Sequence, residues 1–317
     1  KCPRPKLSGS SVNCSAKTPI IPPMLPAVSL HGVTKRFRSK VAIDHLSLEI
    51  GPRKIVGLIG QNGSGKTTLL DLIAGIAIPS AGRCETLGKD SGRLDETILQ
   101  QLGVVFQENR FLGWMRVEQH LTYFGSFYDT WDCERQSLLL ELLDLDPKAK
   151  VGHLSGGDAQ KLGIITAVCH HPKLLLLDEP LSSLDPLARE SVLKLILRLF
   201  DEDELTVIVS SHTLLDVERL VNWVVCLDQG ELRANEATDT LQERFAEWHL
   251  VTRNGAFIEP FREPFVRDQS SSGRHARLVV ENADSKLEAF RERYQADITV
   301  SRLNLEKIYP FLLKGRK

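Results

Sequence analysis

One stretch of sequence decides the fold of this chain, Gly60-Gln61-Asn62-Gly63-Ser64-Gly65-Lys66-Thr67. It follows the apolar run Ile55–Ile59, which predicts a buried strand. An amphipathic pattern comes directly after it and predicts a helix that ends at Pro79–Gly82. The apolar face of this predicted helix carries Leu69, Leu70, Ile73 and Ile76. A strand, a glycine-rich turn and a helix in this order predict an α/β fold with a phosphate site at the turn.

The spacing G-x-x-x-x-G-K-T is that of a phosphate-binding loop, or P-loop. Glycines allow successive backbone amides to point at phosphate oxygens, and the helix adds the positive end of its dipole. Lys66 would reach the β- and γ-phosphates, and the Thr67 hydroxyl would bind Mg²⁺. An ordinary turn is the structural alternative, which the position between a strand and an amphipathic helix makes rare.

Further motifs follow in a fixed order. They are Gln107 after the apolar run 103–106, Leu154-Ser155-Gly156-Gly157, Asp178-Glu179 after the leucines 174–177, Ser182-Ser183-Leu184-Asp185, and Ser210-Ser211-His212. The apolar runs are continuous rather than alternating, which predicts a sheet buried on both faces.

This ordered set strongly resembles the ATP-binding subunit of the ABC transporter superfamily, over about residues 28–235. The resemblance implies a P-loop NTPase of the ABC ATPase type and an Mg²⁺-dependent ATPase activity. The helix-like region at about residues 110–171, which contains no convincing strand pattern, predicts a helical insertion in that α/β domain.

The resemblance also implies the role of each site residue. The residues implied to contact ATP bound to this subunit are Phe37, Gly60, Gln61, Asn62, Gly63, Ser64, Gly65, Lys66, Thr67 and Thr68. The residues implied to bind Mg²⁺ are Thr67, Gln107 and Asp178. Glu179 is the implied general base, His212 the implied switch residue at the γ-phosphate, and Gln107 the implied sensor of Mg²⁺ and water. Ordinary core packing remains the alternative for Phe37, and a solvated loop the alternative for the two carboxylates.

A second ATPase subunit is implied as a partner, in a homodimer or a related heterodimer. In this family the signature residues, here Ser155, Gly156 and Gly157, close over the γ-phosphate held by the other subunit. Asp185 resembles the aspartate that joins the two sites. Two nucleotides are therefore expected between two such domains.

The chain departs from the family pattern at two positions. Asp158 stands where Gln or Glu is usual, and Gln61 stands where many relatives have proline. Neither change removes an atom that contacts phosphate. We therefore still expect ATP hydrolysis.

The ends of the chain have different patterns. Residues 1–27 are rich in Pro, Ser and Lys and predict a flexible leader, with Met24 as a candidate translation start.

Residues 236–317 predict a small α+β accessory or regulatory domain, with strands at 248–252, 277–281 and 298–303. A helix at 285–294 would start with a capping box of Ser285 and Glu288, residues 268–273 would form a mobile loop, and Pro310 would kink a last helix at 305–313.

Composition excludes several classes of protein. The 40 Lys and Arg balance 41 Asp and Glu, so no global basic field points to nucleic acid as a partner. No apolar run approaches the length of about 18 residues that a membrane-spanning helix needs. The six cysteines are scattered without a C-x-x-C pair, which favours reduced thiols in the cytoplasm.

A transporter subunit without a membrane segment needs a separate integral-membrane permease, with this chain peripheral on the inner face of the cell membrane. Phe111, Leu112, Trp114 and Met115 are candidates for the docking surface, with core packing of the insertion as an equal alternative.

Residues 298–309 resemble the tail of bacterial export-type subunits, which favours export. The competing classes are a non-transport ABC ATPase acting on ribosomes or DNA, and a nucleotide sensor with little turnover.

Overall fold

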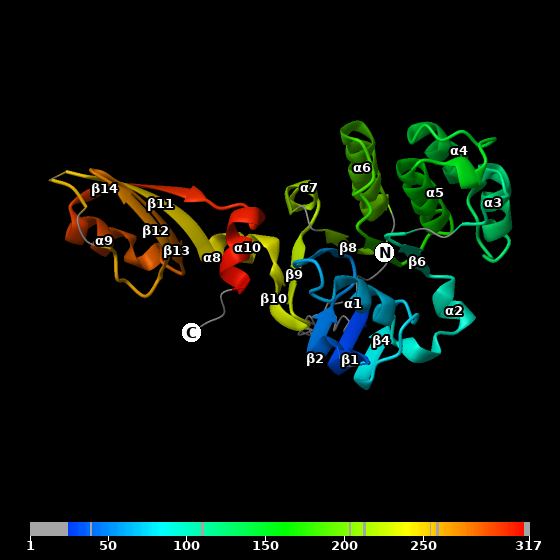
Figure 1. The fold of residues 1–317 in the computed structure, drawn as a ribbon, viewed down its shortest axis with the longest axis horizontal. Helices are drawn as coiled ribbons and strands as arrows, with labels where there is room; N and C mark the ends of the chain where they lie inside the picture. Colours follow the sequence, from blue (N-terminus) through cyan, green and yellow to red (C-terminus); the bar gives the residue numbers. More distant parts are fainter. Residues whose placement is uncertain are drawn as a thin grey trace, which may run out of the picture.

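The computed structural model describes residues 25–38, 40–108, 111–202, 204–211, 214–253, 255–257 and 260–313. His212, Met24 and most of the predicted leader lie outside these ranges. Two layers of sheet and a set of helices surround the P-loop, and a C-terminal unit extends to one side (Figure 1). No helix in the described ranges combines the length and the apolar character needed to cross a membrane.

A six-stranded sheet forms the centre, in the order β10-β9-β3-β8-β7-β6. Its strands are β3 (Ile55–Ile59), β6 (Leu102–Val105), β7 (Leu174–Asp178), β8 (Thr206–Ser211), β9 (Trp223–Asp228) and β10 (Glu231–Ala237). All neighbours run parallel except β9 and β10, which form an antiparallel hairpin. Every residue of β3, β7 and β8 is buried, so the prediction of a sheet covered on both faces is confirmed.

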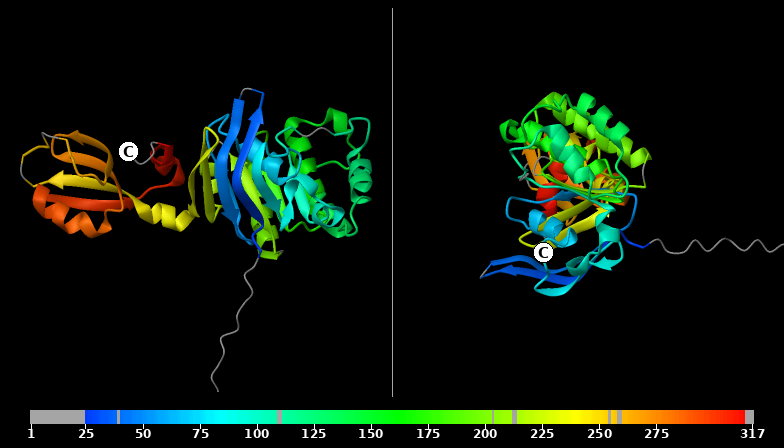
Figure 2. Two further views of the ribbon diagram at one scale, coloured as in Figure 1. Left: turned by 90° about the horizontal axis from the view of Figure 1, so that it is seen from below. Right: turned by 90° about the vertical axis from the view of Figure 1, so that its right-hand side faces the viewer.

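An antiparallel sheet packs below helix α1 (Lys66–Ile73), in the order β2-β1-β4-β5. These strands are β1 (Val28–Phe37), β2 (Lys40–Ile50), β4 (Ala81–Thr86) and β5 (Lys89–Asp90). Side chains such as Leu30, Leu58 and Leu69 form one core between the two sheets and the helix. Figure 2 shows β1 and β2 as a long ribbon beside the central sheet.

Helix α1 is shorter than its apolar pattern predicts. Gly75 adopts a left-handed φ of +74°, and the amides of Ile76 and Ala77 donate back to the Asp71 carbonyl. Ile76 therefore lies outside the helix and is 57% exposed, which corrects its assignment to the buried face.

The insertion is helical, as predicted, with α3 (Val117–Gly125), α4 (Cys133–Leu142) and α5 (Gly156–Val168) after the short α2 (Glu96–Leu99). Helix-like apolar patterns at residues 121–128, 138–145 and 159–170 predict these three helices, and each helix begins several residues before its pattern. Asp132 and Ser155 explain two of these starts, because their side chains accept the amides of Arg135 and Asp158 as N-caps.

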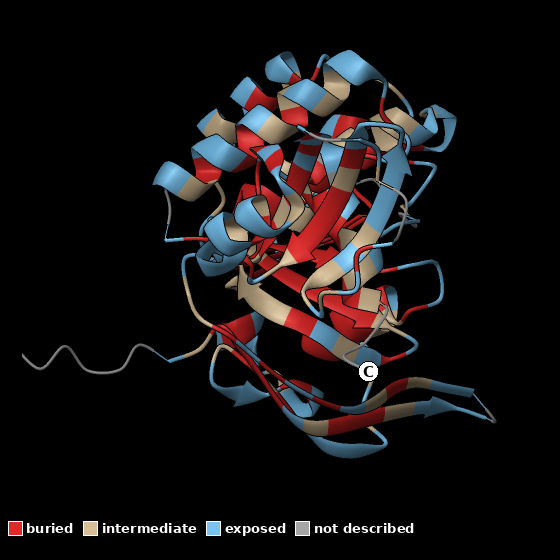
Figure 3. Cartoon of the chain, turned by 90° about the vertical axis from the view of Figure 1, so that its left-hand side faces the viewer, coloured by how far each residue is buried: buried red, intermediate tan, exposed pale blue. Residues whose placement is uncertain are grey.

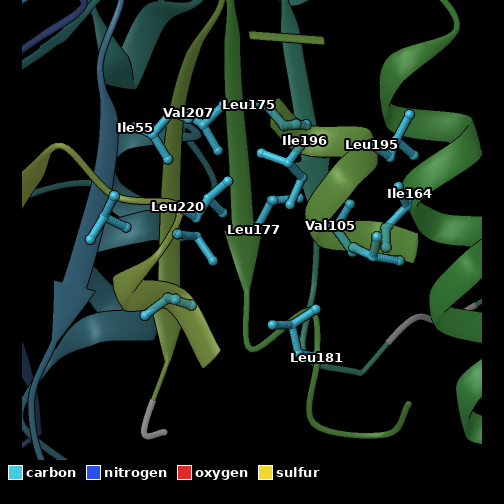
Figure 4. Packing of buried hydrophobic residues seen from close by; sticks show 14 of the residues in the cluster. Ile55, Val105, Ile164, Leu175, Leu177, Leu181, Leu195, Ile196, Val207 and Leu220 are labelled. Carbon is cyan, nitrogen blue, oxygen red and sulfur yellow. The ribbon is translucent and has the colours of Figure 1, made fainter. Parts of the chain in front are cut away.

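The core of this half lies between the sheet and the helices, including α6 (Pro186–Glu202). Ile55, Val207 and Leu177 on the strands belong to one buried cluster with Ile164 and Ile196 on the helices (Figure 4). Figure 3 shows the resulting pattern, with buried strands inside and exposed outer helix faces.

The C-terminal unit continues from α8 (Thr238–Arg244) into an antiparallel sheet of order β12-β13-β11-β14. The strands are β11 (Phe245–Thr252), β12 (Val266–Ser272), β13 (His275–Glu281) and β14 (Ala296–Arg302). Trp248 and Phe290 form the centre of its own core, beneath α9 (Leu287–Tyr294). The α+β character of this part is as predicted.

Two local predictions for this unit are wrong. Residues 268–272 belong to strand β12 rather than to a mobile loop, because β13 offers a complete pairing edge, with Ser270 opposite Arg277. The capping box also does not form, since a 3₁₀ turn at Asp284–Lys286 precedes α9 and its N-cap, Lys286, makes no side-chain hydrogen bond.

The last helix, α10 (Leu305–Leu313), packs on the part of the chain that holds the P-loop rather than in the core formed around Trp248 and Phe290. Leu305, Ile308 and Leu312 belong to the same buried cluster as Cys226 of β9 and Val217 of α7 (Leu214–Glu218). The helix continues through Pro310, which lies on its exposed side. Helix α10 therefore joins the two parts of the chain through a shared core.

We expect Ile308→Ala to lower the free energy of unfolding by about 2–5 kcal/mol, because a fully buried side chain would leave a cavity in this shared core. Denaturant unfolding measures the change. Val300→Ala is the control, since Val300 is 45% exposed and should change the free energy by less than about 0.5 kcal/mol. Equal effects of the two substitutions would contradict the packing described for α10.

Candidate nucleotide-binding site

The P-loop connects the end of β3 to the start of α1 and depends on its glycines. Gly65 has a φ of +108°, and a Cβ atom there would lie 2.6 Å from the Ala42 carbonyl oxygen. A Cβ atom on Gly60 would lie 2.5 Å from the Leu227 carbonyl oxygen. Only glycine fits at these two positions, so the loop keeps its curvature through close backbone contacts with β2 and β9.

Lys66 directs its ammonium group into the loop. Its Nζ donates to the carbonyl oxygens of Gly60 at 2.8 Å and Gln61 at 3.3 Å. Burial lowers the pKa of Lys66, and the nearby carboxylates of Glu179 and Asp178 oppose that shift. The loop therefore concentrates one positive charge where phosphate groups would bind.

Asp178 occupies the end of β7 and is held from two sides. Its Oδ2 accepts a hydrogen bond from the Thr67 hydroxyl at 2.8 Å, and its Oδ1 accepts one from the Ser210 hydroxyl at 2.6 Å. A hydroxyl and a carboxylate side by side are the hard oxygen donors that Mg²⁺ prefers, with substrate phosphates and water as further ligands. The residues present therefore fit an Mg²⁺ site at Thr67 and Asp178.

Glu179 follows with an uncommon backbone conformation. Its φ is +49°, its amide donates to the Ser210 hydroxyl at 2.9 Å, and it is 8% exposed. A left-handed non-glycine residue that the surrounding structure holds in place is typical of functional sites. Ser210 thus positions both carboxylate residues.

Ser210 was not among the predicted site residues. A signal for it was present, because parallel strands align their carboxyl ends and Asp178 pairs with Ser210 in the register of β7 and β8. A polar residue at the end of the strand next to the carboxylates could have indicated this role.

A cavity of about 380 Å³ brings half of the predicted residues together. Its lining consists of Phe37, Lys40, Ala42, Asn62, Gly63, Gly65, Lys66, Thr67, Thr68, Gln107 and Glu179. Lys40 and Ala42 come from β2 and were not predicted. Phe37 is 49% exposed at the rim, which argues against an ordinary core position for it.

Other predicted residues do not line this cavity. Gly60, Gln61 and Ser64 form the supporting side of the loop, where Ser64 is buried. His212 lies outside the described residues, so its place is not given by the structure.

The signature residues form a separate, exposed surface at the start of α5. Ser155 and Gly156 are exposed there, and a Cβ atom on Gly157 would lie 2.9 Å from the Ser183 carbonyl oxygen. Asp185 caps α6, because its Oδ1 accepts the amides of Leu187 and Ala188, and the Ala188 amide lowers its pKa. These four predicted residues are thus close to one another but not in the cavity of their own subunit.

Comparison with known proteins agrees with this geometry. The ABC transporter family matches residues 43–182. The bacitracin transport ATP-binding protein BcrA of Bacillus licheniformis is 29% identical over 302 residues, which cover 89% of this chain and 96% of that protein. The aliphatic sulfonates import ATP-binding protein SsuB 1 of Burkholderia lata is 35% identical over 233 residues, covering 72% of this chain and 70% of that protein.

Solved structures give the same result. A dimeric ATP-binding cassette in a post-hydrolysis state, bound to ADP and Pi, matches with a TM-score of 0.60 and 25% identity over 66% of this chain and 98% of that one. The predicted fold and the predicted ATPase class are confirmed by these relationships. The chain therefore belongs to the ABC transporter family, as one of its ATP-binding proteins.

Proposed function

We propose that this chain is the ATP-hydrolysing subunit of a transporter whose membrane-spanning permease is a separate chain. The observation that carries the proposal is the single cavity in which Lys66, Thr67, Gln107 and Glu179 meet. A cation, a hydroxyl, an amide and a carboxylate in one cavity supply the groups that phosphoryl transfer to water requires.

In this proposal Lys66 and the P-loop amides bind the phosphates of ATP, and Phe37 stacks on the adenine. Glu179 accepts a proton from the attacking water, because its carboxylate lines the cavity beside Thr67. Thr67, Asp178 and Gln107 would hold Mg²⁺, which neutralises charge on the transferring phosphate when it is bound. His212 contacts the γ-phosphate as the family resemblance implies.

A second copy or a related subunit completes each site. The surface formed by the exposed Ser155, Gly156 and Asp185 and the half-buried Gly157 supports this step, since it carries predicted nucleotide contacts that the cavity of its own subunit lacks. ATP then joins two cassettes, and loss of the γ-phosphate removes the contacts that hold them closed.

The permease docks beside the insertion, peripheral to the inner face of the membrane. Trp114 is 72% exposed and Leu112 is exposed as well, whereas Met115 is buried and Phe111 is half-buried against the core. Of the predicted docking residues, Trp114 and Leu112 are thus available to a partner. Both follow Gln107 closely in the chain, which connects the docking surface to the ATP cavity.

We also propose export as the direction of transport. The strand β14 and helix α10 carry the sequence that resembles export-type subunits. The match to the bacitracin transport protein covers 89% of the chain and so extends into the C-terminal unit.

We expect Glu179→Gln to lower kcat for ATP hydrolysis by about 100-fold or more, because it removes the general base, while ATP binding is kept. Phosphate release and equilibrium binding measure the two quantities. Glu190→Gln on the exposed surface of α6 is the matched control and should hydrolyse ATP normally. Lys66→Ala should instead lose ATP binding. Full turnover by Glu179→Gln would refute its role, and a wild-type protein that binds ATP without turnover would favour a sensor.

We expect tagged Glu179→Gln protein, with ATP and Mg²⁺, to recover a multi-spanning membrane protein from gently solubilised membranes of the source organism. Adding Trp114→Arg should reduce the recovery about tenfold, since it places a charge on the exposed docking surface. Val300→Arg, on a strand of the C-terminal unit, is the control and should leave recovery unchanged. Mass spectrometry identifies the recovered chains, and recovery of ribosomal or DNA-associated proteins alone would overturn the transporter proposal.

A further inference from the structure

The aromatic ring at the rim of the cavity has a cation against it. Phe37 lines the cavity and is 49% exposed. The ammonium nitrogen of Lys35 lies 4.9 Å from the centroid of the Phe37 ring. Lys35 is not among the residues that line the cavity, so its ammonium group contacts the ring from outside the cavity. Phe37 therefore has a positive charge on one side and the cavity on the other.

The ammonium group of Lys35 is held in place by the segment that follows α1. Its Nζ donates to the Ile78 carbonyl oxygen at 2.7 Å. Two further hydrogen bonds join the same segment to β1. The Ser80 hydroxyl accepts the Arg36 amide at 3.1 Å, and the Ser80 amide donates to the Thr34 carbonyl oxygen at 2.8 Å. The end of β1 is thus fixed to the residues after α1.

These bonds connect the two ends of the proposed nucleotide site. The P-loop leads into the start of α1, where Lys66 would bind phosphate groups. The segment after α1 is bonded to β1, where the Phe37 ring would stack on adenine. Lys35 therefore helps to fix the position of the ring relative to the P-loop, and the base would meet a surface that is already in place.

The charge of Lys35 also changes the electrostatics of the Phe37 ring. The faces of an aromatic ring carry partial negative charge, which attracts a cation. A purine base also has electron-rich faces, so two stacked rings repel each other through these faces. A cation on the outer face of the Phe37 ring draws π electrons toward itself and leaves the cavity face less negative. Stacking of a purine on the cavity face is then more favourable.

We propose that Lys35 is a positioning residue for the nucleotide base, which acts through Phe37 and strengthens the binding of adenine nucleotides. This inference rests on the proposed stacking of adenine on Phe37. It gives Lys35 a different role from that of Lys66, which interacts with the phosphates. Loss of the Lys35 charge should therefore weaken the binding of nucleotides and leave the binding of base-free phosphates unchanged.

The decisive variant is Lys35→Met, which removes the charge and keeps an unbranched side chain. The dissociation constant for ADP and the KM for ATP should rise about two- to fivefold, as expected for one cation–π contact at an exposed site. The kcat should stay within about twofold, because Lys35 does not line the cavity. Inorganic pyrophosphate with Mg²⁺ is the base-free probe, and its inhibition constant against ATP hydrolysis should not change. Unchanged inhibition by pyrophosphate also shows that the P-loop of the variant is folded.

A double-mutant cycle tests whether Lys35 acts through the ring. Phe37→Leu should itself weaken ADP binding, and Lys35→Met should then have no further effect. Lys35→Arg keeps a cation and should bind ADP within about twofold of the wild-type affinity. Lys89→Met is the matched control, since Lys89 lies in the same sheet and its ammonium group pairs with Asp95 at 3.6 Å. It should leave the ADP affinity unchanged.

Several results would overturn the proposal. One is an ADP affinity of Lys35→Met equal to that of the wild type. Another is an equal loss of pyrophosphate inhibition, which would indicate a direct effect of the charge on the phosphates. A full effect of Lys35→Met in the Phe37→Leu background would indicate a role that does not involve the ring. A wild-type protein that binds neither ADP nor pyrophosphate would instead refute the proposed function.

Discussion

The carboxylate of Asp178 is the constraint on which the ATP site depends. A buried charge of this kind is stable only with hydrogen-bonding partners, and Asp178 takes them from Thr67 at the start of α1 and Ser210 at the end of β8. Ser210 also accepts the amide of Glu179 and so fixes the next residue. One buried carboxylate thereby sets the positions of a helix and two strands, and with them the hydroxyl and the second carboxylate of the cavity.

The sequence predicted the parts of the fold in which local pattern and tertiary packing agree. This agreement holds for the P-loop, which the glycine spacing predicts, and for the buried strands, which the continuous apolar runs predict. It also holds for the insertion, whose helix-like pattern contains no strand. The prediction of a loop at residues 268–272 was wrong because strand pairing decided the structure there and not the polar composition. Strand β13 supplies the hydrogen-bond partners of these residues. The prediction that Ile76 lies on the buried face of the helix was wrong for a different reason. The left-handed Gly75 ends the helix before the apolar pattern ends.

For the site, the order of the motifs indicated candidate residues but not their grouping. Gln107, Thr67 and Glu179 lie far apart in the chain, and the parallel sheet brings their strand ends to one cavity. Lys40 and Ala42 could not be identified, because nothing in β2 signals that it passes beside the P-loop. Ser155 and Asp185 lie on a different surface, which a motif alone cannot distinguish from the cavity.

The order of the central sheet also places the cavity between two different parts of the chain. Strand β6 forms one edge and leads to Gln107 and the insertion, whereas β10 forms the other edge and leads to the C-terminal unit. The cavity lies between them, at the ends of β3 and β7. Gln107 therefore borders the cavity from the β6 side, and the turn at Gly230, whose amide donates to the Ser64 carbonyl, contacts the P-loop from the β10 side.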